Sequence, residues 1–139
     1  MKDNFNDSRI YFHPSVIHSD LPNFTSDADI GVHSMVGTNL NRINALPNKL
    51  FEYIQGGLAL VISDLPEMSK VVHNYKLGLT FKNGDVEDLS NSLIKIISDK
   101  KLIKDFKLAS ALCSQELNWE VEKNKLMNIY DLMIYGIKQ

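Results

Sequence analysis

Three polar side chains within one short segment have the chemistry to bind a charged substrate. Asn48, Lys49 and Glu52 fall on one side of a predicted helix, with Glu52 one turn after the other two. An ammonium group attracts phosphate, and a carboxylate offers two acceptors to hydroxyl groups. These partners suit a sugar-nucleotide, which carries both a diphosphate and a ribose. The alternative is an ordinary amphipathic helix with a solvated polar face, and the pattern alone favours that alternative.

The helix that carries these residues must present its first turn to the substrate. Its apolar side consists of Pro47, Leu50, Phe51 and Ile54. A proline fits the first turn of a helix, where its missing N–H costs no hydrogen bond, so the helix is predicted to start near residues 45–47. The unpaired N–H groups of such a start, together with the helix dipole, attract phosphate. A Gly-Gly break at 56–57 ends the helix, and an apolar strand over 58–62 follows.

The same segment carries a resemblance to a known family. Residues 46–54 read LPNKLFEYI, and residues 57–66 read GLALVISDLP. They resemble the PNKLFEY segment of group 1 glycosyltransferases, family-four-like enzymes with the GT-B fold, in which two Rossmann-like domains face each other across a cleft. The similarity runs from about Arg9 to Tyr130 and matches the later part of the family's C-terminal domain. It implies an α/β class: a three-layer Rossmann-like domain with a mostly parallel sheet of about four strands, followed by C-terminal helices.

The resemblance also implies which residues hold the donor. In the family, backbone amides at this helix start, here at Asn48, Lys49 and Leu50, meet the diphosphate, and a glutamate equivalent to Glu52 binds the ribose. Many members carry a second glutamate that touches the donor sugar, and this chain has Asn44 there, whose amide can still hydrogen-bond a hydroxyl.

Two further implications concern the nucleobase and metals. His13 follows a predicted strand close to the place where the family builds its nucleobase pocket. GT-B enzymes generally work without a bound metal, because helix termini and basic side chains neutralise the diphosphate. A UDP- or GDP-linked sugar is therefore expected as substrate, with no cofactor.

Composition limits the other classes of function. The chain of 139 residues has 44% hydrophobic and 23% charged residues, as expected for one soluble globular domain. A net charge of -2 makes nucleic acid an unsuitable partner. The first seven residues have no apolar core, so we expect no signal peptide, and no apolar run reaches the length of a membrane span. Together these features predict a cytoplasmic protein, with peripheral association at the inner face of the membrane left open.

The first part of the chain is predicted to alternate strands and helices. Residues 1–7 are expected to be frayed, and Ile10–Phe12 to form a short strand. A helix capped by Ser19 or Asp20, with Pro22 in its first turn, should run to about Asp27. The segment 28–34 reads as a strand, and 35–44 as a loop at the edge of the sheet where ligands bind in open α/β folds.

The second part of the chain is predicted to be mainly helical. Asp64 and Glu67 have the form of a capping box before a helix that ends near Asn74. A last strand over 78–81 and a turn that ends in the cap Asp85 should follow. Three later sets of apolar residues repeat at helical spacing, and each predicts a helix. They are Val86, Leu89, Leu93 and Ile96 or Ile97 in the first, Leu102, Phe106, Ala109 and Cys113 in the second, and Trp119, Leu126, Tyr130 and Met133 in the third.

Other chemistries find little support. His18, His33 and His73 have no partners at metal-ligand spacing, and the one cysteine, Cys113, lies among apolar residues, so a buried thiol is expected rather than a nucleophile. Motifs of nucleophilic catalysis and of P-loop or dinucleotide binding are absent from the sequence. A receiver-like signalling domain has the right size, but the acidic pair after a first strand is missing.

The resemblance leaves out part of a GT-B enzyme. We treat residues 1–139 as one partial C-terminal domain, in which 117–139 form a final helix and the strand at 10–12 lacks its usual neighbours. An acceptor domain on another chain, or a homo-oligomer, would supply what is missing. Two functions stay open: a glycosyltransferase, or its donor-binding part, that transfers a hexosyl group to a glycan or lipid-linked acceptor in cell-envelope polysaccharide synthesis, and a non-catalytic remnant or interaction module that keeps the fold.

Overall fold

A parallel sheet of three strands forms the centre of the molecule. The computed structural model describes residues 7–136. The strands β1 (Ile30–His33), β2 (Ala59–Ser63) and β3 (Gly78–Phe81) lie in the order β1-β2-β3. Ile30 is paired with Ala59, and Leu60 with Gly78, so the carboxyl ends of all three strands meet at one edge. A side chain at Gly78 would place its Cβ 1.9 Å from the carbonyl oxygen of Leu60, which explains the glycine.

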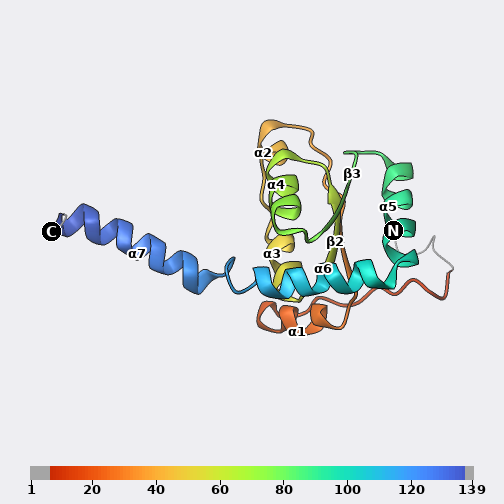
Figure 1. The fold of residues 1–139 in the computed structure, drawn as a ribbon, viewed down its shortest axis with the longest axis horizontal. Helices are drawn as coiled ribbons and strands as arrows, with labels where there is room; N and C mark the ends of the chain where they lie inside the picture. The colour runs from red at the N-terminus through yellow and green to blue at the C-terminus, as the bar shows by residue number, and fades with distance from the viewer. Residues whose placement is uncertain (1–6, 137–139) are drawn as a thin grey trace.

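Helices cover both faces of this sheet and give three layers (Figure 1). The helices α3 (Asn48–Gln55) and α4 (Pro66–Tyr75) lie on one face, and α5 (Val86–Ser98) lies on the other. The helix α6 (Lys100–Cys113) runs beneath the layers, near α1 (Leu21–Ser26). The remaining elements are a 3₁₀ turn η2 (His18–Asp20), the short helix α2 (Leu40–Ile43) and the final helix α7 (Trp119–Tyr135).

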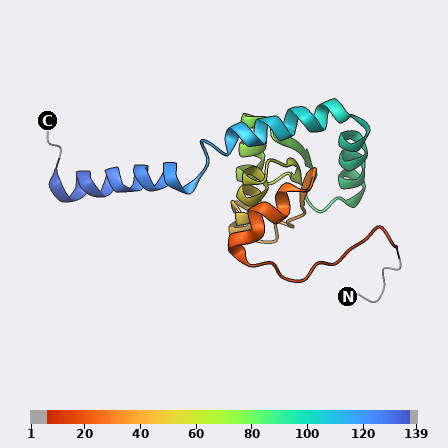
Figure 2. The ribbon, with the colours of Figure 1, turned by 90° about the horizontal axis from the view of Figure 1, so that it is seen from below.

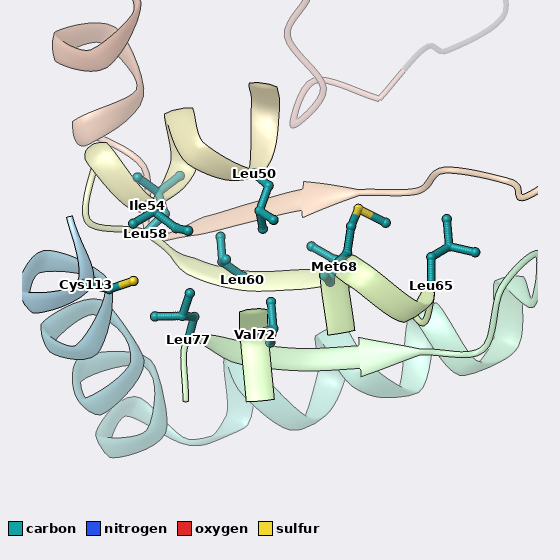
Figure 3. Packing of buried hydrophobic residues seen from close by; sticks show 10 residues of the cluster. Leu50, Ile54, Leu58, Leu60, Leu65, Met68, Val72, Leu77 and Cys113 are labelled. Carbon is teal, nitrogen blue, oxygen red and sulfur yellow. The ribbon is translucent and has the colours of Figure 1, made fainter. Parts of the chain in front are cut away.

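The middle strand explains the layering. All five residues of β2 are buried, and its four apolar residues alternate between two apolar clusters. Leu60 and Ile62 join the larger cluster with residues of α3 and α4, whereas Ala59 and Val61 join the smaller one with Ile96 of α5. Figure 3 shows the larger cluster, whose labelled members are Leu50, Ile54, Leu58, Leu60, Leu65, Met68, Val72, Leu77 and Cys113.

The strand predicted at Ile10–Phe12 does not form. This segment has no strand partner among residues 7–136, and the three side chains are 44%, 79% and 51% exposed. A strand needs a neighbour to pair its backbone groups, and β1 forms the edge of the sheet without using this segment. The sheet therefore has three strands among the described residues rather than about four. The fraying expected for residues 1–7 concerns residues outside the described range, except for Asp7.

Several predicted elements are confirmed with small shifts. The strand predicted over 28–34 is β1, the strand over 78–81 is β3, and the segment 35–44 contains the short helix α2 instead of an uninterrupted loop. Pro47 is the N-cap of α3 and so lies one position before the predicted first turn. Asp85 caps α5 as predicted, because its Oδ1 accepts hydrogen bonds from the N–H groups of Glu87 and Asp88.

Two other predicted caps are wrong. Asp20 is the N-cap of α1, but neither its side chain nor that of Ser19 accepts a capping hydrogen bond, although Pro22 does lie in the first turn. Leu65, not Asp64, is the N-cap of α4. Asp64 instead accepts a hydrogen bond of 2.5 Å from the hydroxyl of Ser69. A side-chain partner in space therefore replaces the local capping box.

The final three helices follow their predicted stripes to different extents. In α5, Ile96 rather than Ile97 is buried, and Val86 is exposed. In α6, Cys113 is buried, and Ser110 Oγ donates a buried hydrogen bond of 2.6 Å to the carbonyl of Leu58. The stripe of α7 is exposed, and Figure 2 shows that this helix extends away from the rest of the molecule. Within residues 7–136, no helix combines the length and the apolar character that crossing a bilayer would require.

Candidate functional site

The candidate site lies where β1 ends and α3 begins, at the carboxyl edge of the sheet. His33 is the last residue of β1, and its Nε2 is buried without a hydrogen-bond partner among the described residues. Burial lowers the pKa of His33, and the positive charge of Lys49 lowers it further. At neutral pH the imidazole is therefore uncharged and available for a hydrogen bond beside an ammonium group.

The first turn of α3 receives no side-chain cap. Its N-cap is Pro47, and the proline side chain has no acceptor for the first backbone N–H groups. The N-termini of four other helices are capped by Asn39, Asp85, Asp99 and Asn118. Asn48 and Lys49 stand exposed at this helix start, so an anion there meets free amide donors and a positive charge.

Leu50 fits its predicted role less well than its neighbours. Its side chain is fully buried in the larger apolar cluster, so only its backbone could touch a ligand. That N–H already donates a hydrogen bond of 3.0 Å to the carbonyl of Pro47. The donors that remain at the helix start belong to Asn48 and Lys49.

Glu52 lies one turn further along the same face and is half-buried. Neither Glu52 nor Lys49 makes an ion pair within residues 7–136. Burial raises the pKa of the neighbouring Tyr53, and the carboxylate of Glu52 adds to this effect. No side chain in the described part of the protein pairs with either charged group, so both are available to a ligand.

Tyr53 fixes the position of α3 against β1. Its hydroxyl donates a hydrogen bond of 3.2 Å to the carbonyl of Val32, and its ring packs over Gly31. A Cβ at Gly31 would lie 2.5 Å from the ring carbon Cδ2 of Tyr53. The glycine therefore lets the helix approach the strand closely enough to bring Lys49 near His33.

The loop between β1 and α3 is held by hydrogen bonds to its surroundings. The N–H of Gly37 donates to Oδ1 of Asn83, which lies in the turn after β3. Asn44 ends α2, and its Nδ2 donates 3.1 Å to the carbonyl of Leu40. One N–H of the Asn44 amide is therefore engaged, and its second N–H and its Oδ1 are left for a sugar hydroxyl.

The structure places His13 against α1. Its ring packs edge-on against Phe24 of α1, with the ring centroids 4.9 Å apart. The next residue, Thr25, lies against Gly56 at the carboxyl end of α3. Asn48 lies at the opposite end, about 12 Å away along a helix of this length. The structure therefore separates His13 from the other predicted donor-binding residues.

His33 is the site residue that the sequence interpretation missed. The sequence pattern raises it only as a metal ligand without partners, and within residues 7–136 no group of three His, Cys, Asp or Glu side chains is placed to hold a metal ion. The available signal was its position as the last polar residue of a strand before a ligand-binding loop. Cys113 is buried as predicted, and burial raises the pKa of its thiol to about 11.

Comparison with known families identifies the class of this domain. The family model described as Glycosyl transferases group 1 matches residues 1–99, which include every element from α1 to α5. The chain belongs to this family. Its helix-covered parallel sheet is a Rossmann-like α/β domain, as the resemblance implied. The match ends at residue 99, before α6, whereas the resemblance was expected to reach about Tyr130. No curated protein matches the chain.

Proposed function

We propose that this chain binds the nucleotide-sugar donor of a glycosyltransferase reaction. The hexosyl group of a UDP- or GDP-linked sugar would pass to a glycan or lipid-linked acceptor in cell-envelope polysaccharide synthesis. The observation that carries the proposal is the uncapped start of α3, where Lys49 and the half-buried Glu52 have no ion-pair partner among residues 7–136. A diphosphate and a ribose would satisfy these groups.

Each residue then has a defined role. The first amides of α3 and the ammonium group of Lys49 hold the diphosphate, and Glu52 accepts hydrogen bonds from the ribose hydroxyls. As the sugar leaves, negative charge grows on the diphosphate, and donors already fixed in place stabilise it without reorganising. The neutral imidazole of His33 supplies a further hydrogen bond to the donor from Nε2. No metal ion enters this scheme, because the helix start and Lys49 neutralise the charge.

A second function, nucleotide binding without transfer, is favoured by Asn44. In many family members a glutamate at this position touches the donor sugar. Asn44 has no charge, and its Nδ2 already donates a hydrogen bond to the carbonyl of Leu40. A module of this kind would keep the diphosphate and ribose contacts but hold the sugar weakly. The two functions differ in whether the sugar adds to the affinity for the nucleotide.

Calorimetric titration with UDP, GDP and ADP, and with their sugar conjugates, tests both functions. One nucleotide should bind saturably, and Glu52→Ala should weaken it by about 1–3 kcal/mol, or roughly 5–150-fold in Kd, because the ribose loses one or two hydrogen bonds. Glu87→Ala is the matched control, since Glu87 is exposed on α5 at the opposite face. EDTA should leave the affinity unchanged.

The outcomes separate the proposals. A folded chain that binds none of the nucleotides, or that loses equal affinity with both substitutions, contradicts donor binding at α3. Binding that is no tighter for the sugar conjugate than for the bare nucleotide favours the module without transfer. Tighter binding of one conjugate identifies the sugar and supports the glycosyltransferase.

A further inference from the structure

The outward side of α6 combines basic and apolar side chains. At 100° per residue, the exposed side chains of α6 that are larger than alanine fall within an arc of about 140°. We call this arc the α6 surface: Lys100, Lys101, Lys104, Asp105, Leu108 and Leu112. The two leucines lie one turn apart and are 61% and 59% exposed. Because lysines surround them, the surface is both apolar and positively charged.

The opposite side of α6 is fixed to the body of the molecule. Ser110 Oγ donates a hydrogen bond of 2.6 Å to the carbonyl of Leu58, and Cys113 is buried in the larger apolar cluster. Lys107 Nζ pairs with Oδ1 of Asp29 at 2.9 Å. Figure 1 shows α6 beneath the layers, whereas α7 projects away from them. The α6 surface is therefore held in place and faces outward.

The charge of this region is opposite to that of the rest of the chain. Residues 95–107 contain five lysines and two aspartates, a net charge of +3, in a chain whose total is -2. The remaining residues therefore carry a net charge of -5. Lys95, Lys100 and Lys104 are exposed, and none of them makes an ion pair within residues 7–136. An anionic partner would meet their ammonium groups without displacing a carboxylate.

The two aspartates of this region are engaged with α6 itself. Oδ1 of Asp99 caps the helix and accepts hydrogen bonds of 3.0 Å from the N–H groups of Lys101 and Leu102. Asp105 pairs with the ammonium group of Lys101. The aspartates therefore lower the local charge but pair with no other lysine of the region in the described structure.

We propose that the α6 surface docks on a lipid bilayer that contains anionic headgroups. The lysine ammonium groups meet the headgroup phosphates, and Leu108 and Leu112 enter the boundary with the acyl chains. Lysines suit this position, because their apolar stems can lie along the leucines while the charges reach the headgroups. Ile97, which is 61% exposed in the last turn of α5, adds apolar surface directly before α6.

A bilayer satisfies both kinds of side chain, whereas nucleic acid satisfies only one. Nucleic acid is bound mainly through its phosphates, which would pair with the lysines but leave the two leucines in water. Docking also leaves the candidate donor site open. The helix α6 packs on Leu58 at the amino end of β2, and the start of α3 lies at the carboxyl edge of the sheet. The inference is therefore independent of donor binding at α3.

Co-sedimentation of the whole chain with vesicles tests the docking. The chain should bind vesicles of phosphatidylcholine and phosphatidylglycerol but not phosphatidylcholine alone, and high salt should weaken the binding because it screens the lysines. Each lysine near an anionic surface contributes roughly fivefold in affinity, so Lys100→Glu combined with Lys104→Glu should weaken the binding at least about 25-fold. Absence of binding to anionic vesicles, or binding that survives both substitutions, overturns the inference.

The matched control makes the same change of charge on α7. Lys123 and Lys125 pair with carboxylates of their own helix, at 3.6 Å and 2.6 Å. Lys123→Glu combined with Lys125→Glu should therefore bind vesicles like the wild type. An equal loss in both double variants would mean that only net charge matters, which contradicts docking through α6. Both should keep the circular dichroism and nucleotide affinity of the wild type, so a failure of docking is distinguishable from a failure of donor binding.

Tryptophan fluorescence locates the docking surface. The chain has a single tryptophan, Trp119 on α7, so Trp119→Phe gives a background without indole emission. In that background, Leu108→Trp should shift its emission to shorter wavelength on anionic vesicles, because the indole leaves water. Leu126→Trp on the exposed α7 should show no shift. A shift at Leu126→Trp without one at Leu108→Trp overturns the inference. Equal affinity for a DNA duplex would identify phosphate charge alone as the ligand and would also overturn it.

Discussion

The contact between Gly31 and Tyr53 makes a sharp prediction, because it sets how closely α3 approaches β1. An added methyl group in Gly31→Ala would lie 2.5 Å from Cδ2 and 2.6 Å from Cγ of the Tyr53 ring. Both ring atoms lie near the backbone end of the side chain and cannot swing away as a flexible tip could. Either the ring leaves its position or the helix moves off the strand.

The magnitude follows from the overlap. Ordinary contacts between carbon atoms lie at about 3.5–4.0 Å, so roughly 1 Å of displacement is required. Overpacking of this kind costs about 1–3 kcal/mol in the free energy of unfolding. Displacement of the ring also weakens the hydrogen bond from the Tyr53 hydroxyl to Val32, which is worth about 0.5–1.5 kcal/mol. We therefore expect a loss of about 2–4 kcal/mol.

A double-mutant cycle measured by urea denaturation isolates this contact. Tyr53→Ala removes the ring, so Gly31→Ala in that background should cost little, and the coupling should be nearly the whole loss, about 2–4 kcal/mol. Gly78→Ala is the control, because its Cβ would meet the backbone oxygen of Leu60, and Tyr53→Ala should not rescue it. If Gly31→Ala costs the same in both backgrounds, Tyr53 is not what requires the glycine, and the positioning role assigned to it is wrong.

Two further predictions concern titratable groups. The pKa of His33 is lowered in the folded state, so the unfolded state binds more protons as the pH falls below about 6.5, and the protein should lose stability from that pH downward. In urea titrations, the His33→Gln variant should lose less stability between pH 7 and pH 5 than the wild type. An identical pH profile for the two proteins would contradict the burial of this imidazole. The thiol of Cys113, with its pKa raised to about 11, should react with a thiol reagent at pH 8 much more slowly in the native protein than in denaturant, and equal rates would show that it is accessible.

The elements that depend on local interactions can be predicted from the amino-acid sequence alone. Asp85 caps α5 because its carboxylate needs only the N–H groups two and three residues ahead. The apolar run 58–62 predicts a strand buried on both faces, since no polar residue interrupts it. The side of α3 that faces the core follows from helical spacing, and so does the grouping of Asn48, Lys49 and Glu52 on the other side. These features were predictable because every partner lies within one helical turn or one strand.

Features that depend on partners distant in the chain could not be predicted in this way, because they follow from how the elements pack. Ile10–Phe12 has the composition of a strand, but strand formation needs a neighbour that the sequence does not reveal. Asp64 has the local form of a cap, yet the hydroxyl of Ser69 competes for its carboxylate. His33 meets Lys49 because Gly31 and Tyr53 bring a helix against a strand from a distant part of the chain. The stripe of α7 reads like any core-facing helix, since periodicity tells which side of a helix is apolar but not which surface will cover it.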